Sequence, residues 1–445
     1  MSPRRKFILI LIVCAVLLAT TSFGHPLHRL ISAAVEASHA PWVGNEIVVA
    51  GKNNSEYEPA IAFNWKHNEY LVVWRGFDGI YGQRVSATGK LVGPTPFSIA
   101  TGTKTRRKPS VDYDPLHDRY LVVWMYDKGS PDWNINGRFI PWQGPAQSLS
   151  EFEIITFFTF DEYPKVVYAR ATEEFLLVWV TKANNVSEIW GVRLKSMDGT
   201  IPGGENAHLI SKAGELCDHP DVAYNLKRNE YLVTWEVKKS SLDIYGVRLK
   251  GDAQPMAPGI IAIAGWPDDE RSPAVAAIGD ADQYLVVWQS EYTPNNQDIF
   301  ARIVFGNAVL STTVHHIEWT PANEIYPDVS SDRGGSQFLV VWQQQYSSTS
   351  GPYGISGRMV FPVLGGIILC PGCDNTADTV DSLGDIFTIV SPYTGDPDRT
   401  KPAVTGGFAQ FLTVWEYLRP GSTDQDIHAK LVIPHVVFLP LVIHK

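Results

Sequence analysis

The 445-residue sequence has only four cysteines, and it lacks the short motifs that identify many enzymes. It contains no Gly-x-Ser-x-Gly elbow, no phosphate-binding loop and no His-Glu-x-x-His zinc motif. These absences argue against the common serine hydrolases, nucleotide hydrolases and zinc proteases. Beyond the N-terminal segment the chain also lacks a long helical periodicity, so we expect an all-β protein.

Basic residues are outnumbered, with 37 Lys and Arg against 47 Asp and Glu and a formal net charge of −10. Nucleic-acid-binding proteins need a basic surface, so we expect no nucleic-acid partner. The charge is compatible with a cationic ligand or with a neutral one such as a glycan. We expect a monomer whose ligand is a glycan or a protein.

The N-terminus carries a long apolar run. Arg4, Arg5 and Lys6 precede an apolar segment from residue 8 to residue 19, which is the order found in a secretory signal. We therefore expect residues 1–24 to be a signal peptide, cleaved near Gly24 or as late as Ala40, and residues 25–44 to be a linker. A retained anchor is the alternative, but the run is short for a membrane span.

We expect the mature protein to be secreted or displayed on the cell surface, without a transmembrane segment. Residues 434–445 form an apolar C-terminal tail that is also too short to span a bilayer. In an exported protein, Cys370 and Cys373, which flank a Pro-Gly turn pair, are expected to form a local disulfide. Cys217 is then left as a free or buried thiol.

We expect no cofactor. Calcium is a weakly supported alternative, because acids and amides cluster closely in one stretch. That stretch contains Asp374, Asn375, Asp378, Asp381 and Asp385, and it lacks the Gly and Glu of an EF-hand loop. A solvated polar loop is the more common outcome for such a pattern.

A repeat dominates the rest of the chain. Its centre is an apolar run ending in Trp, such as Tyr231-Leu232-Val233-Thr234-Trp235, and a Pro stands fifteen residues before the Trp in six copies and thirteen before it in the last. The seven Trp residues are Trp74, Trp124, Trp179, Trp235, Trp288, Trp342 and Trp415. A fixed period near fifty residues indicates one supersecondary unit stacked on copies of itself.

Each repeat has the pattern of four strands. The first follows the Pro, the second is the Trp-containing run, the third is an alternating stretch such as residues 243–248, and the fourth is short. Seven such units predict a seven-bladed β-propeller of four-stranded antiparallel blades over residues 45–433, with an insertion at about 363–392.

The ends of the repeat region complement each other. Residues 46–50 have the pattern of a fourth strand without a blade of its own, and the last copy has three strands. We expect residues 46–50 to pair with residues 426–431, so that an N-terminal strand completes the last blade and covers an open edge. A linear array of sheets is the alternative.

Candidate site residues come from two places in the repeat. The residues three before each Pro are predicted to surround the channel mouth, where carboxylates and Arg could bind a polar ligand or act as acid and base. These are Glu56, Arg106, Asp161, Cys217, Glu270, Glu324 and Arg399. Turn capping or pairing with neighbours is the alternative role.

The loops after the Trp run supply aromatic candidates that could stack on sugars or contact a protein. They are Phe77, Tyr126, Trp133, Tyr292, Tyr346 and Tyr417. Packing between neighbouring blades is the alternative role for them.

The repeat, with its Pro-x-Val-Ala-Tyr, Tyr-Leu-Val-Val-Trp and Asp-Ile-Tyr-Gly-x-Arg segments, resembles that of exported bacterial seven-bladed β-propeller proteins. The resemblance covers about residues 46–433 and implies architecture without a set of catalytic residues. We therefore expect a binding module that uses the channel-mouth face, with catalysis as the less favoured outcome. The alternatives are a polysaccharide-active enzyme of glycoside hydrolase or lyase type, and a structural envelope protein.

Overall fold

The computed structural model describes residues 40–51, 55–129, 132–144, 150–155, 160–204, 206–294, 296–345, 351–364, 367–368, 383–391 and 398–434. The chain divides into two units, residues 1–40 and 41–445, and all described strands belong to the second. Apart from one short 3-10 turn, η1 (Pro202–Gly204), the described elements are β-strands. The expected all-β class is confirmed.

The strands form antiparallel four-stranded sheets whose members follow chain order. One sheet contains β3 (Tyr57–Asn64), β4 (Glu69–Arg75), β5 (Gly79–Ser86) and β6 (Leu91–Thr101). Another contains β15 (Cys217–Asn225), β16 (Glu230–Lys238), β17 (Leu242–Lys250) and β18 (Pro255–Ala264). A third contains β19 (Glu270–Ile278), β20 (Gln283–Thr293), β21 (Asn296–Phe305) and β22 (His315–Glu318). A fourth contains β23 (Glu324–Ser331), β24 (Phe338–Gln345), β25 (Tyr353–Val360) and β28 (Leu383–Val390).

Two further four-strand groups are joined into one eight-stranded sheet by a single parallel pairing of Phe160 with Trp133. The first group is β7 (Arg106–Asp114), β8 (Arg119–Gly129), β9 (Asp132–Pro141) and β10 (Phe152–Ile155). The second is β11 (Phe160–Ala169), β12 (Glu174–Ala183), β13 (Val186–Lys195) and β14 (His208–Leu209). β26 (Val363–Leu364) and β27 (Ile367–Ile368) form a separate hairpin inside the range assigned to the insertion, and β28 also begins there.

The remaining sheet combines the two ends of the unit. β29 (Arg399–Gly406), β30 (Phe411–Leu418) and β31 (Gln425–Ile433) pair in order, and both β1 (Trp42–Val43) and β2 (Ile47–Ala50) pair antiparallel with β31. In this register Ile47 lies opposite Ala429 and Val48 lies opposite His428. β1 lies within the stretch that the sequence indicates as a linker.

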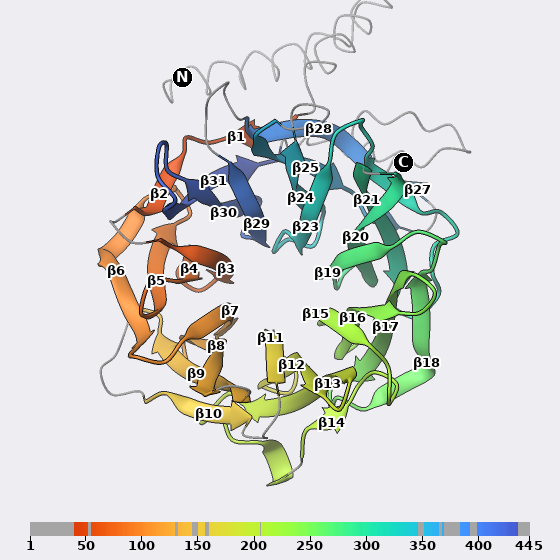
Figure 1. Cartoon of the computed structure of the whole chain (residues 1–445), viewed down its shortest axis with the longest axis horizontal. Coiled ribbons are helices and arrows are strands. Elements are labelled where there is room, and N and C mark those ends of the chain that lie inside the picture. The colour runs from red at the N-terminus through yellow and green to blue at the C-terminus, as the bar shows by residue number, and fades with distance from the viewer. Residues whose placement is uncertain are drawn as a thin grey trace, which may run out of the picture. The chain divides into compact units, whose positions relative to one another are not determined.

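The arrangement is propeller-like. Figure 1 shows β3, β7, β11, β15, β19, β23 and β29, the first strands of the four-strand groups, lying innermost around a common centre. Each of these strands contacts the next along the chain, and β29 contacts β3. The residues of the innermost strands are therefore brought together although they are spread over most of the sequence.

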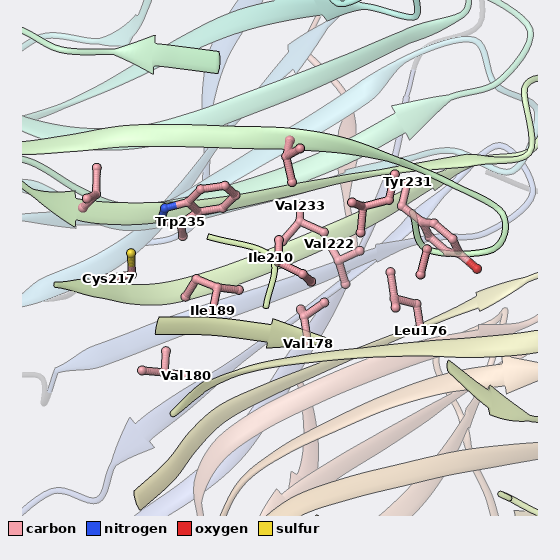
Figure 2. Packing of buried hydrophobic residues seen from close by; sticks show 14 of the residues in the cluster. Leu176, Val178, Val180, Ile189, Ile210, Cys217, Val222, Tyr231, Val233 and Trp235 are labelled. Atoms are coloured by element: carbon pink, nitrogen blue, oxygen red, sulfur yellow. The ribbon is translucent and has the colours of Figure 1, made fainter. Parts of the chain in front are cut away.

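The core lies between neighbouring sheets. In the second strand of each group, alternate side chains face opposite neighbours, so Leu71 packs toward β8 while Val72 and Trp74 pack toward β30. Figure 2 shows one such layer, in which Val178 and Val180 of β12 pack near Val233 and Trp235 of β16. The repeated Trp residues have exposed fractions of at most 2%, which explains why the run is apolar on both faces.

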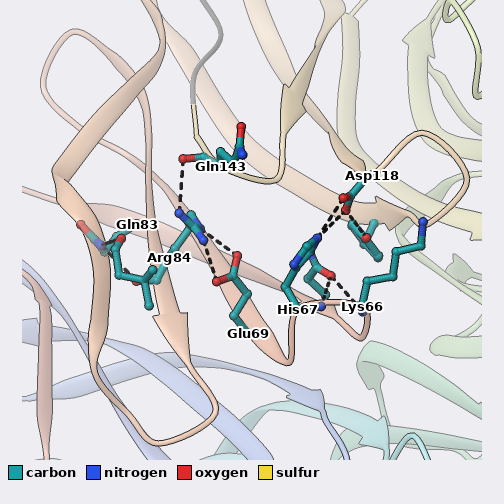
Figure 3. Close-up of polar contacts among 10 residues, drawn as sticks. Lys66, His67, Glu69, Gln83, Arg84, Asp118 and Gln143 are labelled. Carbon is teal, nitrogen blue, oxygen red and sulfur yellow. Dashed lines mark hydrogen bonds and ion pairs between the residues drawn. The ribbon is translucent and has the colours of Figure 1, made fainter.

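Polar contacts also join neighbouring sheets. Arg84 on β5 forms an ion pair with Glu69 at 2.8 Å and donates to the carbonyl of Gln143, which follows β9 (Figure 3). His67, in the turn after β3, contacts Asp118 at 2.9 Å. These contacts fix the turns at the end of the first strands relative to the next sheet.

The first strands differ from expectation in one detail. Each begins two to four residues before its Pro, and a register shift follows at the Pro, for example between Asp218 and Asp221. The Pro therefore sits at a β-bulge inside the strand, where its missing N–H leaves no ladder bond unmade. The predicted signal peptide, Cys370, Cys373, the stretch 374–382 and the tail from residue 435 lie outside the described residues.

Candidate functional site

The innermost strands enclose a cavity of about 1140 Å³. All seven first strands contribute to its wall, from Glu58 in β3 to Gly406 in β29. Hydrogen bonds between adjacent strands keep equivalent residues at the same level: the Asp221 carboxylate accepts from the N–H of Val275, and the Asp328 carboxylate accepts from that of Val404. The strand starts therefore share one end of the cavity and the strand ends share the other.

A ring of bulged residues lines the strand-start end. Each is the residue immediately before a repeat Pro, and each has a positive φ between 47° and 56°, a backbone conformation that is uncommon outside glycine. The ring consists of Glu58, Lys108, Tyr163, His219, Ser272, Tyr326 and Lys401. Bulges redirect side chains at the rims of β-structures, and here they place seven different side chains on the cavity wall.

The strained backbone of this ring is held by side chains from the preceding sheet. The N–H of Tyr326 donates to Gln289, and the N–H of Glu58 donates to Glu416, both at 2.8 Å. Gln289 and Glu416 each follow a repeat Trp, so the acceptor is a feature of the repeat. A left-handed backbone conformation of this kind costs on the order of 1 kcal/mol per residue. It is kept where contacts with the surrounding structure hold the backbone in place.

His219 is the only histidine in this ring of seven residues. Its imidazole lies 3.2 Å from the Glu236 carboxylate and packs on the Tyr163 ring with a centroid distance of 4.6 Å. Burial lowers the pKa of His219, but the hydrogen bond and negative charge of Glu236 outweigh burial and raise it. The imidazolium is thereby favoured beside the cavity.

Two residues further along the strands, on the other side of the Pro, three charged side chains converge on the cavity. Lys165 of β11 forms an ion pair with Asp221 of β15 at 3.4 Å, and its charge also reaches Asp328 of β23. Burial raises the pKa of Asp328 to about 6, with Lys165 opposing that rise and Asp221 adding to it. The negative charge of Asp221 in turn raises the pKa of Lys165 against the effect of burial.

This arrangement places two carboxyl groups in different surroundings. Burial allows Asp328 to hold a proton in mildly acidic solution, while Asp221 forms an ion pair with the Lys165 ammonium. Such a pair has the chemistry needed for acid–base work on a glycosidic bond. A group of three or more His, Cys, Asp and Glu placed to hold a metal ion is absent from the described residues.

The predicted ring three residues before each Pro lies elsewhere. Its members are 7% exposed or less and do not contribute to the cavity wall. They are Glu56, Arg106, Asp161, Cys217, Glu270, Glu324 and Arg399. The bulge explains this, because it turns the preceding residues into the sheets and presents the residue next to the Pro.

These buried residues have partners inside the sheets. Asp161 accepts from the indole N–H of Trp179 at 3.1 Å, Glu324 accepts from Gln344 at 2.6 Å, and Arg106 contacts Glu151 at 3.2 Å. Burial raises the pKa of Glu324 to about 8. Ligand binding by the residues three before each Pro stays a prediction. Their contacts inside the sheets give them a structural role. Cys217 is a buried free thiol.

The predicted aromatic residues are dispersed. Phe77 is 85% exposed, whereas guanidinium groups of Arg106, Arg107 and Arg399 lie over the rings of Tyr126, Trp133 and Tyr417 respectively. The side chain of Tyr292 and all of Tyr346 lie outside the described residues. None of the described ones lines the cavity.

Sequence reasoning missed the residues on both sides of each Pro. Their signal was present, because Asp221 and Asp328 occur as Pro-Asp pairs and Lys165 as Pro-Lys, where three other copies have Pro-Ala and one has Pro-Ser. Recognising them required the positions of the bulges, which the apolar pattern does not specify.

Comparisons with known proteins give matches to solved structures. No protein-family model and no curated protein matches the chain. An oligogalacturonate lyase in complex with manganese has a TM-score of 0.47 at 9% identity, covering 88% of this chain and 98% of that one. An endo-arabinase from Bacteroides thetaiotaomicron has a TM-score of 0.41 at 13% identity, covering 74% and 98%, and a thermostable family-43 glycoside hydrolase has 0.39 at 12%, covering 63% and 98%.

These comparisons correct the expected function. The expectation of a non-catalytic binding module is wrong, because the similar structures are those of carbohydrate-active enzymes, which agree better with the alternative of a polysaccharide-active enzyme. They also bring no sequence-family support for the resemblance to exported repeat proteins. At these identities and TM-scores the similar structures do not indicate which reaction this protein catalyses. That evidence has to come from the residues of the cavity. No helix among the described residues is long and apolar enough to cross a membrane.

Proposed function

We propose that the protein is a polysaccharide-active enzyme of the glycoside hydrolase type that works with Asp221 and Asp328 in the central cavity. The observation that carries the proposal is the convergence of Lys165, Asp221 and Asp328 from three separate sheets on one level of the cavity. Pockets with converging polar groups and shifted pKa values are the usual places of catalysis.

In the proposed reaction Asp328 is the general acid. Protonated below about pH 6, it gives its proton to the oxygen of the scissile glycosidic bond as that bond breaks. Asp221, ion-paired with Lys165, acts on the other side of the sugar as base toward water or as nucleophile. If Asp221 is the base, the proton of the attacking water ends on Asp221, and proton exchange with solvent restores both groups. If Asp221 is the nucleophile, water cleaves the covalent sugar–Asp221 intermediate, and the proton of that water returns to Asp328.

Lys165 distinguishes hydrolysis from elimination by a lyase. A lyase needs a base that removes a proton from the sugar ring carbon, and a neutral amine is one candidate. The raised pKa of Lys165 keeps it as an ammonium, which suits charge stabilisation better than proton removal. This favours the hydrolase form of the proposal.

The test is sugar release from a panel of plant and microbial polysaccharides, measured as new reducing ends between pH 4 and pH 8. We expect release from at least one polymer at pH 5 and a decline as the pH rises through about 6, because the general acid loses its proton. Absence of release from the whole panel by protein with an intact melting transition would contradict the proposal. Unsaturated products that absorb in the ultraviolet would show that the enzyme cleaves by elimination and not by hydrolysis.

We further propose that the described unit is a ring of seven four-stranded blades closed by β2. Four observations support this: the pairing of β2 with β31, the contact of β29 with β3, a core cluster that joins Val72 and Trp74 to Leu412 and Val414, and seven copies of the strand-start bulge. Blade counting in an experimental density map tests the number directly.

Export, the Cys370–Cys373 disulfide and a monomeric state are kept as proposals. Export rests on the apolar segment from residue 8 to residue 19 after a basic start, and the disulfide rests on the Cys-Pro-Gly-Cys turn. Mass spectrometry of the secreted protein, with and without reductant, tests cleavage and the disulfide together. Calcium at residues 374–385 is tested by a melting curve with and without a chelator.

A further inference from the structure

The strand-end side of the cavity carries a second cluster, made of one indole and two guanidinium groups. The Cζ of Arg170 lies 5.2 Å from the ring centre of Trp65, and the Cζ of Arg333 lies 5.1 Å from it. The three residues follow β3, β11 and β23, which belong to three different sheets, and all three line the cavity. Residues far apart in the sequence thus meet at one place on its wall.

The cluster has an excess of positive charge. Both Arg side chains are exposed to the cavity or solvent, and no ion pair within the described part of the chain holds either guanidinium. Asp112 is the carboxylate whose charge reaches Arg333, but its two oxygens already accept from the N–H groups of Tyr113 and Tyr168 at 2.7 Å. Two cations therefore face one carboxylate that is engaged elsewhere.

Other acids on this wall do not remove the excess. Asp332 accepts hydrogen bonds from Ser336 and Gln337 in its own turn. Asp280 also lines the cavity, but the charges that act on Arg333 are those of Asp112 and Arg170. Desolvation within the cavity lowers the pKa of Arg333, and repulsion from Arg170 lowers it further, so an added anion would relieve that repulsion.

The distance from the carboxyl pair fits an extended ligand. Arg170 is five residues beyond Lys165, and Arg333 is five beyond Asp328, along or just past strands that rise roughly 3.3 Å per residue. The Arg cluster is therefore on the order of 16 Å further along the cavity. An oligosaccharide bound between Asp221 and Asp328 could extend to it.

From this geometry we propose that Trp65, Arg170 and Arg333 bind the carboxylate of a uronic acid unit, so that the substrate is an acidic polysaccharide. The proposal deepens the hydrolase proposal and rests on it for the position of the cleaved bond. A guanidinium presents parallel N–H donors that match the two oxygens of a carboxylate, and the indole holds both guanidinium groups in place.

The test is calorimetric titration with short oligomers of galacturonate, glucuronate and mannuronate, and with galactose oligomers of equal length. Titrations use the Asp328→Asn variant, so that turnover does not consume the ligand. We expect saturable binding of at least one uronate oligomer, at least tenfold tighter than its neutral counterpart. The substitutions Arg170→Met and Arg333→Met should each weaken it at least tenfold and leave the neutral oligomer unchanged.

Arg107→Met is the matched control, because the exposed Arg107 guanidinium also lies over an indole, 5.7 Å from the Trp133 centre, but outside the cavity wall. It should change uronate binding by less than twofold. Equal affinity for acidic and neutral oligomers, an equal loss with Arg107→Met, or stronger binding of a sulfated oligomer would each overturn the proposal.

The two proposals can fail separately. Uronate binding that depends on Arg170 and Arg333 without sugar release would leave this inference standing and remove the hydrolase. Release from neutral polymers only, unaffected by either Arg substitution, would keep the hydrolase and remove this inference.

Discussion

The two ends of the cavity have opposite chemistry on the same backbone. At the strand starts two carboxyl groups, Asp221 and Asp328, share one ammonium, that of Lys165. At the strand ends two guanidinium groups, Arg170 and Arg333, lie over one indole with a single carboxylate in reach. One end can transfer protons, whereas the other can hold an anion.

The difference shows how a repeat acquires a site. In the copies with Ala60, Ala274 and Ala403, the position after the Pro carries only a methyl group, although the strand is the same. The copies with Asp221 and Asp328 use one carboxylate oxygen to hold the next strand, and the other oxygen of Asp221 pairs with the Lys165 ammonium. Single side chains therefore turn a structural contact into a chemical group without changing the scaffold.

The substitution Asp328→Asn gives the strongest test of the proposed difference between the two ends of the cavity. The amide oxygen can still accept from the N–H of Val404, so the strand contact is retained, but the group can no longer donate a proton as an acid. We expect sugar release to fall by about 100-fold or more, in the range given by loss of a general acid. The measurement is kcat on the polymer found in the panel.

Asp112→Asn is the control for that substitution. Asp112 makes the same kind of contact, to the N–H of Tyr168, but lies toward the other end of the cavity. Its kcat should remain within about threefold of the parent value, since it transfers no proton in the proposed reaction. Equal losses for the two variants would mean that the Asp residues serve the fold alone.

Removing the cation at the strand starts should have an intermediate effect. In Lys165→Met the positive charge that lowers the pKa of Asp328 is lost, so the pKa of Asp328 should rise and the alkaline decline of activity should move to higher pH. We expect kcat to fall roughly tenfold as Asp221 loses its partner. Lys165→Arg should restore the pH profile, and an unmoved profile in Lys165→Met would exclude electrostatic coupling.

The strand starts should also make stability depend on pH. Burial raises the pKa values of Glu56, Glu270 and Glu324 to about 8, so the folded protein keeps protons that the unfolded chain loses near pH 4.5. The stability that these three groups contribute should therefore be fully present below pH 4.5 and be lost as the pH rises through about 8. In Glu324→Gln the difference in Tm between pH 5 and pH 8 should shrink by roughly 2 °C.

Glu153→Gln provides the comparison for that measurement, because Glu153 is an exposed carboxylate paired with Lys128. It should leave the pH dependence of Tm unchanged. A Tm that rises between pH 5 and pH 8 in the parent protein would show that these carboxyls are ionised in the folded state.

The sequence predicted the repeat unit well, because Trp235 and its equivalents are buried on both faces and the apolar pattern reports burial directly. It placed the ring of residues that lines the cavity two positions too early in each repeat. Residues such as Glu270 and Ser272 differ only in their place relative to a bulge, and a bulge changes direction without changing hydrophobicity. The cluster of Trp65 with Arg170 and Arg333 depends on which strands meet across the centre, and this is a tertiary property that no local pattern encodes.

The smallest expected effect compares the bulge ring with the aromatic loops that the sequence favoured. Tyr326 is 46% exposed at the strand-start end of the cavity, and Phe77 is 85% exposed on a loop outside it. If the polymer enters past the ring, Tyr326→Ala should raise KM about threefold with little change in kcat, because it removes stacking area at the entrance. Phe77→Ala should leave both constants unchanged. The reverse result, with KM sensitive to Phe77 alone, would place substrate on the outer loops and separate recognition from the cavity.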